Sequence, residues 1–263
     1  VTDENGVAIF SEIPIGTYTI YEDEKTVPTA YLVADPQNVT VTYAETKEVP
    51  IENKEKTGSI TVHKTTEGQK NIEGIKFYLR GTSDSGRAID IPATTDKDGI
   101  AKFDGVPIGT YMVIEDEETV PYGYLVADEK EVKVEYAQTI DETILNNEQT
   151  GTVKVHKKTA DMTNVEGIRF ILSGISDTGR EIRIEATTDK DGLAKFEGVP
   201  VGTYTITEDG STVPYGYLVA DSKQVTVAYA QTVDTDMVNE KAPDTPNTGV
   251  TDNDSDGSNC LLY

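Results

Sequence analysis

The stretch VGTYTITEDGSTVPYGYLVAD, residues 201–221, decides the fold. Its first half alternates as a strand does, with Tyr204 and Ile206 on one face and threonines on the other. Glu208 falls on the apolar face, so its carboxylate is expected to point into the core. Because a buried, unpaired charge is costly, Glu208 is either an accident of the pattern or part of a site.

The stretch occurs three times, which argues against an accident. IGTYTIYEDEKTVPTAYLVAD and IGTYMVIEDEETVPYGYLVAD precede it, and the three glutamates, Glu22, Glu115 and Glu208, follow one another at intervals of 93 residues. A period of 93 residues is too long for a solenoid repeat and is typical of a small sandwich domain. Abundant Thr, Val, Ile and Tyr, with turn pairs such as Asp98-Gly99, favour short strands.

The sequence therefore predicts an all-β chain of tandem antiparallel β-sandwich domains, prealbumin-like or inverse immunoglobulin-like. We expect residues 1–54 to be the C-terminal part of a truncated first repeat, because they match only the later half of the others. Residues 55–148 and 149–241 are expected to be complete sandwiches, and 242–263 a Pro- and Asp-rich linker. In the second repeat the expected strands are 58–64, 74–81, 87–95, 100–107, 109–115, 124–128, 131–137 and 143–147.

Charge and cysteine content exclude several classes of protein. The formal net charge of −24 argues against binding to nucleic acid or to anionic membranes, which both select basic patches. The single cysteine, Cys260, excludes an intramolecular disulfide. We find no phosphate-binding glycine loop, no nucleophile elbow and no CxxC pair, and we expect no cofactor.

Two further polar residues share the inward parity of the glutamates. The first strand of each complete repeat ends in an inward lysine, and the last strand ends in an inward asparagine. The half-repeat keeps the asparagine alone. These residues are Lys64 with Asn146, Lys157 with Asn239, and Asn53.

A buried lysine, glutamate and asparagine can react with one another. Burial disfavours the charged forms of lysine and of carboxyl groups, so the amine becomes a nucleophile and the acid can hold and transfer a proton. Attack of the amine on the asparagine side-chain carbon would expel ammonia and leave an amide cross-link, helped by proximity. The alternative interpretation is a buried Lys–Glu salt bridge with asparagine as a hydrogen-bond partner. The residues alone leave both open.

Residues 1–241 resemble the Cna protein B-type repeat, the prealbumin-like domain of Gram-positive surface adhesins and pilins. The resemblance is carried by ITVHK, GIKFYL, TTDKDGIAKFDGVPIGTYMVIE, VPYGYLVAD and TILNN. It implies an isopeptide bond between the first-strand lysine and the last-strand asparagine, assisted by the glutamate. Glu22 and Asn53 would have no lysine partner. The implied sets are Lys64, Glu115 and Asn146, and Lys157, Glu208 and Asn239.

The linker contains a second motif, TPNTG, made of Thr245, Pro246, Asn247, Thr248 and Gly249. It resembles the sortase signal Leu-Pro-x-Thr-Gly, with threonine in place of leucine. By analogy, a sortase would cut after the second threonine and join the chain to peptidoglycan. The nearby DNDSDG, residues 252–257, mimics a calcium loop but lacks its closing glutamate, so we expect an acidic spacer and no metal site.

These expectations combine into a function. The chain is expected to be a stalk segment of an extracellular Gram-positive adhesin that is anchored to the cell wall. Each complete repeat is expected to form its isopeptide bond once, and the chain is not expected to be an enzyme. Its expected partners are sortase and peptidoglycan, with host protein or glycan bound through upstream domains, and no nucleic acid or small-molecule substrate. One alternative is that the repeats themselves bind host protein or carbohydrate, and another is a pilus subunit. The PYGY segments contain four tyrosines that could stack on a sugar ring, but we expect them to pack their loop over the end of the sandwich. They are Tyr122, Tyr124, Tyr215 and Tyr217.

Overall fold

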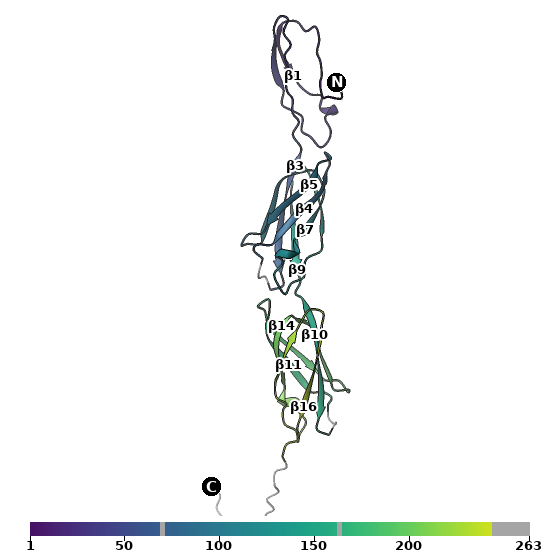
Figure 1. Ribbon diagram of the computed structural model, residues 1–263, viewed down its shortest axis with the longest axis vertical. Coiled ribbons are helices and arrows are strands. Elements are labelled where there is room, and N and C mark those ends of the chain that lie inside the picture. The colour runs from purple at the N-terminus through teal and green to yellow at the C-terminus, as the bar shows by residue number, and fades with distance from the viewer. Residues whose placement is uncertain (69–71, 162–164, 244–263) are drawn as a thin grey trace, which may run out of the picture. The chain divides into compact units, whose positions relative to one another are not determined.

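The computed structural model describes residues 1–68, 72–161 and 165–243. The chain divides into two compact units, Val1–Gln149 and Thr150–Tyr263. The described residues are mostly strands, joined by turns and three short 3-10 helices (Figure 1). No helix in the described ranges is both long and apolar enough to cross a membrane.

The second repeat is a sandwich of two sheets (Figure 1). One has the order β6-β3-β9 and the other β5-β4-β7-β8. Every pairing is antiparallel except β3 with β9, the first and last strands, which run parallel. The all-β sandwich prediction is confirmed, with this one parallel pair inside it. The strands are β3 (Thr57–Thr66), β4 (Lys76–Ser83), β5 (Ala88–Thr94), β6 (Ile100–Pro107), β7 (Gly109–Glu115), β8 (Lys130–Val134) and β9 (Thr139–Asn146).

The third repeat has the same topology. Its sheets have the orders β13-β10-β16 and β12-β11-β14-β15, and its first and last strands, β10 and β16, are again parallel. The strands are β10 (Thr150–Thr159), β11 (Arg169–Ser176), β12 (Glu181–Thr187), β13 (Leu193–Pro200), β14 (Gly202–Glu208), β15 (Lys223–Val227) and β16 (Thr232–Asn239).

The residues before β3 form a smaller element. Strands β1 (Gly16–Ile20) and β2 (Gln37–Val41) pair antiparallel. In the sequence they correspond to β7 and β8, which begin 93 residues later. Apolar side chains that a complete repeat buries are open here: Phe10 is 66% exposed, whereas its counterpart Phe103 is 1% exposed.

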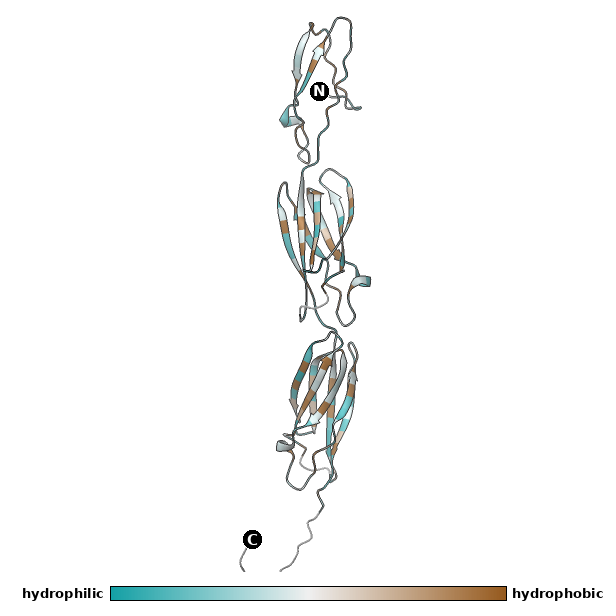
Figure 2. Cartoon of the chain, turned by 90° about the vertical axis from the view of Figure 1, so that its left-hand side faces the viewer, coloured by the Kyte–Doolittle hydropathy of each residue, from teal (hydrophilic) through white to brown (hydrophobic). Residues whose placement is uncertain are grey.

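Strand alternation builds both cores. Along β3 and β10, buried and half-buried residues alternate over the full length. Figure 2 shows the same pattern as brown and teal residues alternating along the strands. The core of the second repeat gathers apolar side chains from both sheets, among them Val62, Phe77, Phe103 and Tyr111. Burial of such side chains contributes about 1.5–3 kcal/mol each, which makes this core the main source of stability.

One predicted strand is absent. Residues 124–128, YLVAD, make only an isolated bridge, Tyr124 with Glu148, and the remainder is not a strand. The amide of Ala127 and the carbonyl of Leu125 bond to buried side chains, as described below, and so these two groups are not available to a neighbouring strand. Between it and β7 lies a 3-10 helix, η2 (Glu117–Thr119), that the sequence did not predict; its counterparts are η1 (Glu24–Thr26) and η3 (Gly210–Thr212). Each helix begins at an aspartate whose side chain accepts a backbone hydrogen bond, as Asp116 does from Glu118.

Candidate functional site

Three strands bring a lysine, a glutamate and an asparagine together inside the second repeat. Lys64 lies on β3, Glu115 at the end of β7 and Asn146 at the end of β9, so both sheets contribute. Each occupies an inward position of its strand, and their exposed fractions are 2%, 7% and 0%. Strand parity therefore placed all three polar side chains in the core.

The ammonium of Lys64 is held by two backbone carbonyls and one carboxylate. Nζ donates to the carbonyl oxygens of Thr65 (3.0 Å) and Ile144 (3.1 Å). Glu115 Oε1 stands 3.3 Å from Nζ as an ion-pair partner, without hydrogen-bond alignment. Burial lowers the pKa of Lys64 from its usual 10.5, and the attraction of Glu115 only partly opposes this. The site thus favours the neutral, nucleophilic amine more than water does.

The carboxylate of Glu115 contacts the asparagine on its other side. Oε2 accepts a hydrogen bond of 2.6 Å from Asn146 Nδ2. In contrast, Glu115 Oε1 and Asn146 Oδ1 are buried without a hydrogen-bond partner. Buried acceptors rarely remain unsatisfied.

The sequence reasoning missed two residues of the site, Leu125 and Ala127, which act through their backbone. The amide of Ala127 donates to Glu115 Oε2 at 2.8 Å, and the carbonyl of Leu125 accepts from Asn146 Nδ2. These residues belong to the YLVAD segment that was wrongly predicted as a strand. The available signal was its recurrence, at a constant distance after each glutamate, in all three copies.

The third repeat reproduces the arrangement. Lys157 Nζ donates to the carbonyls of Lys158 (2.7 Å) and Met237 (3.1 Å) and lies 3.5 Å from Glu208 Oε1. Asn239 Nδ2 donates to Glu208 Oε2 at 2.6 Å. Burial again lowers the pKa of Lys157, with Glu208 opposing the shift.

The backbone contacts of the third repeat are equivalent too. The carbonyl of Leu218 accepts from the Asn239 amide at 2.8 Å, and the amide of Ala220 donates to Glu208 at 2.7 Å. Two independent copies of one geometry show that the arrangement follows from the repeated sequence.

Residues 1–54 contain part of the same site. Asn53 Nδ2 donates to Glu22 Oε2 at 2.5 Å and to the carbonyl of Leu32 at 2.9 Å, and Ala34 donates to Glu22 at 2.8 Å. Glu22 and Asn53 are only half-buried. No ion pair to Glu22 occurs among the described residues, in contrast to the other two glutamates.

The remaining predicted features do not form a site in the described ranges. Thr245, Pro246, Asn247, Thr248 and Gly249, and the acidic stretch after them, lie outside the described residues. Within the described part of the chain, no group of three or more His, Cys, Asp or Glu side chains could hold a metal ion.

The tyrosines of the two PYGY segments divide into two kinds. Tyr124 is 3% exposed and packs as predicted, whereas Tyr122 and Tyr215 are 74% and 105% exposed. The hydroxyl of Tyr217 donates to Asp161. The second tyrosine of each pair is therefore buried (Tyr124) or half-buried with a bonded hydroxyl (Tyr217), whereas the first is exposed.

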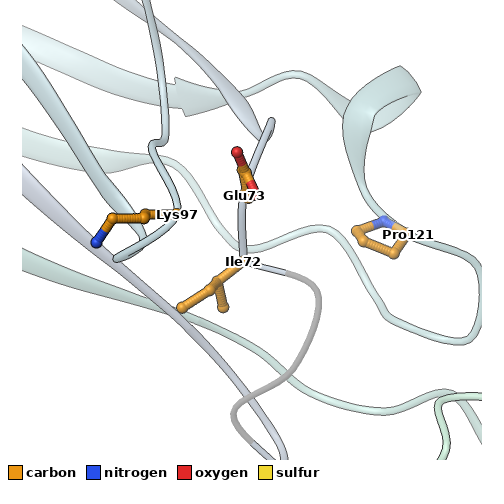
Figure 3. A pocket seen from close by; sticks show the side chains of 4 residues that line it. All are labelled: Ile72, Glu73, Lys97 and Pro121. Carbon is orange, nitrogen blue, oxygen red and sulfur yellow. The ribbon is translucent and has the colours of Figure 1, made fainter.

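A shallow hollow of about 490 Å³ lies beside the sandwich of the second repeat. Its lining side chains do not converge on a common point, since Lys97 and Pro121 lie on opposite sides of Ile72 and Glu73 (Figure 3). The ammonium of Lys97 is paired with Asp98 at 2.6 Å. The hollow offers no arrangement comparable to the buried sites.

Comparison with known proteins assigns the repeats to a family. The model of a family described as the SpaA prealbumin-like fold domain matches residues 58–149 and 151–241. No curated protein matches the sequence. Among solved structures, the Bacillus anthracis TIE protein is similar with a TM-score of 0.63 and 21% identity, over 90% of this chain and 44% of that one. The chain thus spans less than half the length of the TIE protein.

Two pilins are also similar, at lower scores. GBS52, the minor pilin of Streptococcus agalactiae, has a TM-score of 0.34 and 19% identity, over 72% of this chain and 98% of that one. The shaft pilin SpaA of Lactobacillus rhamnosus GG has a TM-score of 0.33 and 16% identity, over 72% of this chain and 100% of that one.

Proposed function

The chain belongs to the family of SpaA prealbumin-like fold domains, and on this basis we propose that it is a structural stalk segment of a bacterial surface protein or pilus. Each complete repeat closes one isopeptide bond, between Lys64 and Asn146 and between Lys157 and Asn239. One observation carries the proposal: in both repeats a buried glutamate contacts a buried lysine through one carboxylate oxygen and a buried asparagine through the other.

The proposed reaction is a transamidation within the core. The neutral amine of Lys64 attacks Cγ of Asn146, forming a C–N bond, while the lysine proton passes to Glu115. Nδ2 of Asn146 takes up a proton and leaves as ammonia, so the products are a neutral amide and one NH₃. Glu115 acts as the general acid and base, and its contact with both partners supports this role.

The environment supports each step. Burial lowers the pKa of Lys64 and so favours the nucleophile. The carbonyl of Leu125 and Glu115 Oε2 both accept from Nδ2, which fixes the amide and points its leaving nitrogen toward the acid. Because the packed core already holds the reactants in place, the reaction loses less translational and rotational entropy than it would in solution.

The proposed bond suits a load-bearing protein. It joins the first strand to the last and closes a loop of about 80 residues, which is worth about 4–5 kcal/mol by the chain-entropy estimate for cross-links. Tension applied at the two ends of a repeat would then pass through the covalent bond and bypass most of the sandwich. Each repeat reacts once with itself and is not an enzyme in the ordinary sense.

The proposal extends to location. TPNTG, residues 245–249, would serve as the sortase signal through which the chain is joined to peptidoglycan on the cell surface, following its resemblance to Leu-Pro-x-Thr-Gly. The Cna B-type character of the repeats is part of the same proposal, since it rests on the lysine, glutamate and asparagine positions.

Intact mass tests the central claim. The purified chain is expected to be lighter than its sequence by two ammonia molecules. Glu115→Ala and Glu208→Ala are each expected to reduce the deficit to one, and Glu22→Ala is the matched control that leaves it at two. A parent mass equal to that of the sequence would mean that Lys64 and Lys157 are ion-pair partners only, and would overturn the proposal.

A further inference from the structure

Tyr124 connects the loop of the site to the strand that carries the lysine. It is 3% exposed, and its hydroxyl donates to the backbone carbonyl of Glu67 at 3.0 Å. Glu67 directly follows Thr66, the last residue of β3. The aromatic ring thus spans from the segment before Leu125 to the end of the strand that holds Lys64.

The same residue is bound to the end of the last strand. Tyr124 forms an isolated bridge with Glu148, and its carbonyl accepts from Gln149 Nε2 at 3.1 Å. The next amide, that of Leu125, donates to the carbonyl of Asn147 at 2.9 Å. Tyr124 is therefore fixed to both strands whose residues react, immediately before the loop atoms that contact Asn146 and Glu115.

We propose that Tyr124 and Tyr217 are positioning residues for isopeptide formation, acting through the backbone of Leu125–Ala127 and Leu218–Ala220. The inference rests on the proposed function, because it concerns the rate of that reaction. Without the hydroxyl anchor, the loop shifts relative to the first strand. The Leu125 carbonyl then no longer holds the Asn146 amide against Glu115, and a small displacement at a reacting centre slows the reaction severalfold.

The two repeats use different chemistry for this anchor. The Tyr124 hydroxyl binds a backbone carbonyl, whereas the Tyr217 hydroxyl binds the carboxylate of Asp161, which also pairs with Lys241 at 3.3 Å. A side-chain acceptor can be removed by substitution and a backbone acceptor cannot. Asp161→Ala therefore tests the anchor of the third repeat without altering a tyrosine.

Timed synthesis of the full chain provides the test. The chain is made in a cell-free reaction, quenched at intervals and digested, and the cross-linked fraction of each repeat is read by mass spectrometry. Tyr124→Phe is expected to slow bond formation in the second repeat about three- to tenfold and to leave the third unchanged. Tyr217→Phe and Asp161→Ala are expected to slow the third repeat alone. Tyr122→Phe, at a 74% exposed side chain, is the matched control and is expected to change neither rate.

A purely structural effect gives a different result. In chains with Asn146→Ala, which cannot cross-link the second repeat, adding Tyr124→Phe is expected to lower the unfolding midpoint by no more than the loss of one hydrogen bond does. Sucrose, which stabilises folded states, is expected not to restore the rate of Tyr124→Phe. A rate restored by sucrose, or a Tyr124→Phe rate equal to the parent's, overturns the inference while leaving the proposed function in place. A parent chain that loses no ammonia overturns both.

Discussion

The Nζ atom of Lys64 lies 3.3 Å from Oε1 of Glu115, and the side chains of both residues are at most 1% exposed. Desolvating two opposite charges commonly costs as much as their attraction returns, unless further hydrogen bonds satisfy them. Here Oε1 has no such bond. Lys64 Nζ and Glu115 Oε2 each make two further hydrogen bonds, so the unsatisfied Oε1 is the unfavourable part of the unreacted site, and the proposed conversion to a neutral amide and a neutral acid would remove both charges.

Removing the lysine alone should expose this cost. Lys64→Met prevents the bond and leaves Glu115 buried without a cation, so the second repeat is expected to be about 3–5 kcal/mol less stable than in Asn146→Ala, which also lacks the bond but keeps the ion pair. The double variant Lys64→Met/Glu115→Leu also lacks the bond but has no buried charge, and is expected to recover most of this loss. Urea unfolding measures the difference, with the third repeat as internal reference. A single variant as stable as the double would contradict the argument.

The rate of bond formation should depend on pH through Lys64. Only the neutral amine attacks, and burial lowers its pKa below 10.5. The rate is therefore expected to rise with pH and to level off at a pH below 10.5, where the folded-state amine is already neutral. Timed synthesis followed by mass analysis at several pH values checks this. A rate still rising in step with pH beyond 10.5 would show that the core does not perturb the lysine.

Alkaline pH should destabilise the second repeat through Tyr111. Its hydroxyl donates to the carbonyl of Pro107 at 2.8 Å, and burial raises its pKa to about 12 from 10.0. Between these values the unfolded chain loses the proton first, so stability is fully present below pH 10 and falls as pH rises toward 12. The loss is roughly 2–3 kcal/mol. Unfolding measured across this range should show a shallower decline for Tyr111→Phe, and equal slopes would count against the assignment.

Gly58 should tolerate no side chain. A Cβ there would stand 2.5 Å from the carbonyl oxygen of Glu135 and 2.7 Å from that of Gln138, both backbone atoms. Gly58→Ala is therefore expected to cost about 1–3 kcal/mol and to delay bond formation in the second repeat, because β3 cannot seat fully. Gly16→Ala is the control, since its Cβ would meet only ordinary contacts at 3.5 Å. Denaturant unfolding compares the two, and equal costs would refute the steric explanation.

The sequence predicted the side chains of the site better than its backbone. Strand parity was enough to turn Lys64, Glu115 and Asn146 inward, because period-2 alternation ties each position to one face. The contacts of Leu125 and Ala127 were not predictable in this way. They use carbonyl and amide groups that every residue carries, so no residue type marks them, and the apolar letters of YLVAD suggested a strand. Recurrence marked the segment as important without showing what it does.

The register of the parallel pair has one further consequence. Ile144 stands opposite Lys64, and Asn146 stands opposite Thr66, so the two residues proposed to react are diagonal neighbours and not partners across the ladder. A slip of one residue would turn Asn146 to the outer face of the sheet. The proposed reaction could then proceed only in molecules whose first and last strands have aligned correctly. The bond would act as a proofreading step in folding, made irreversible by the escape of ammonia, so that correctly assembled repeats are the ones made permanent.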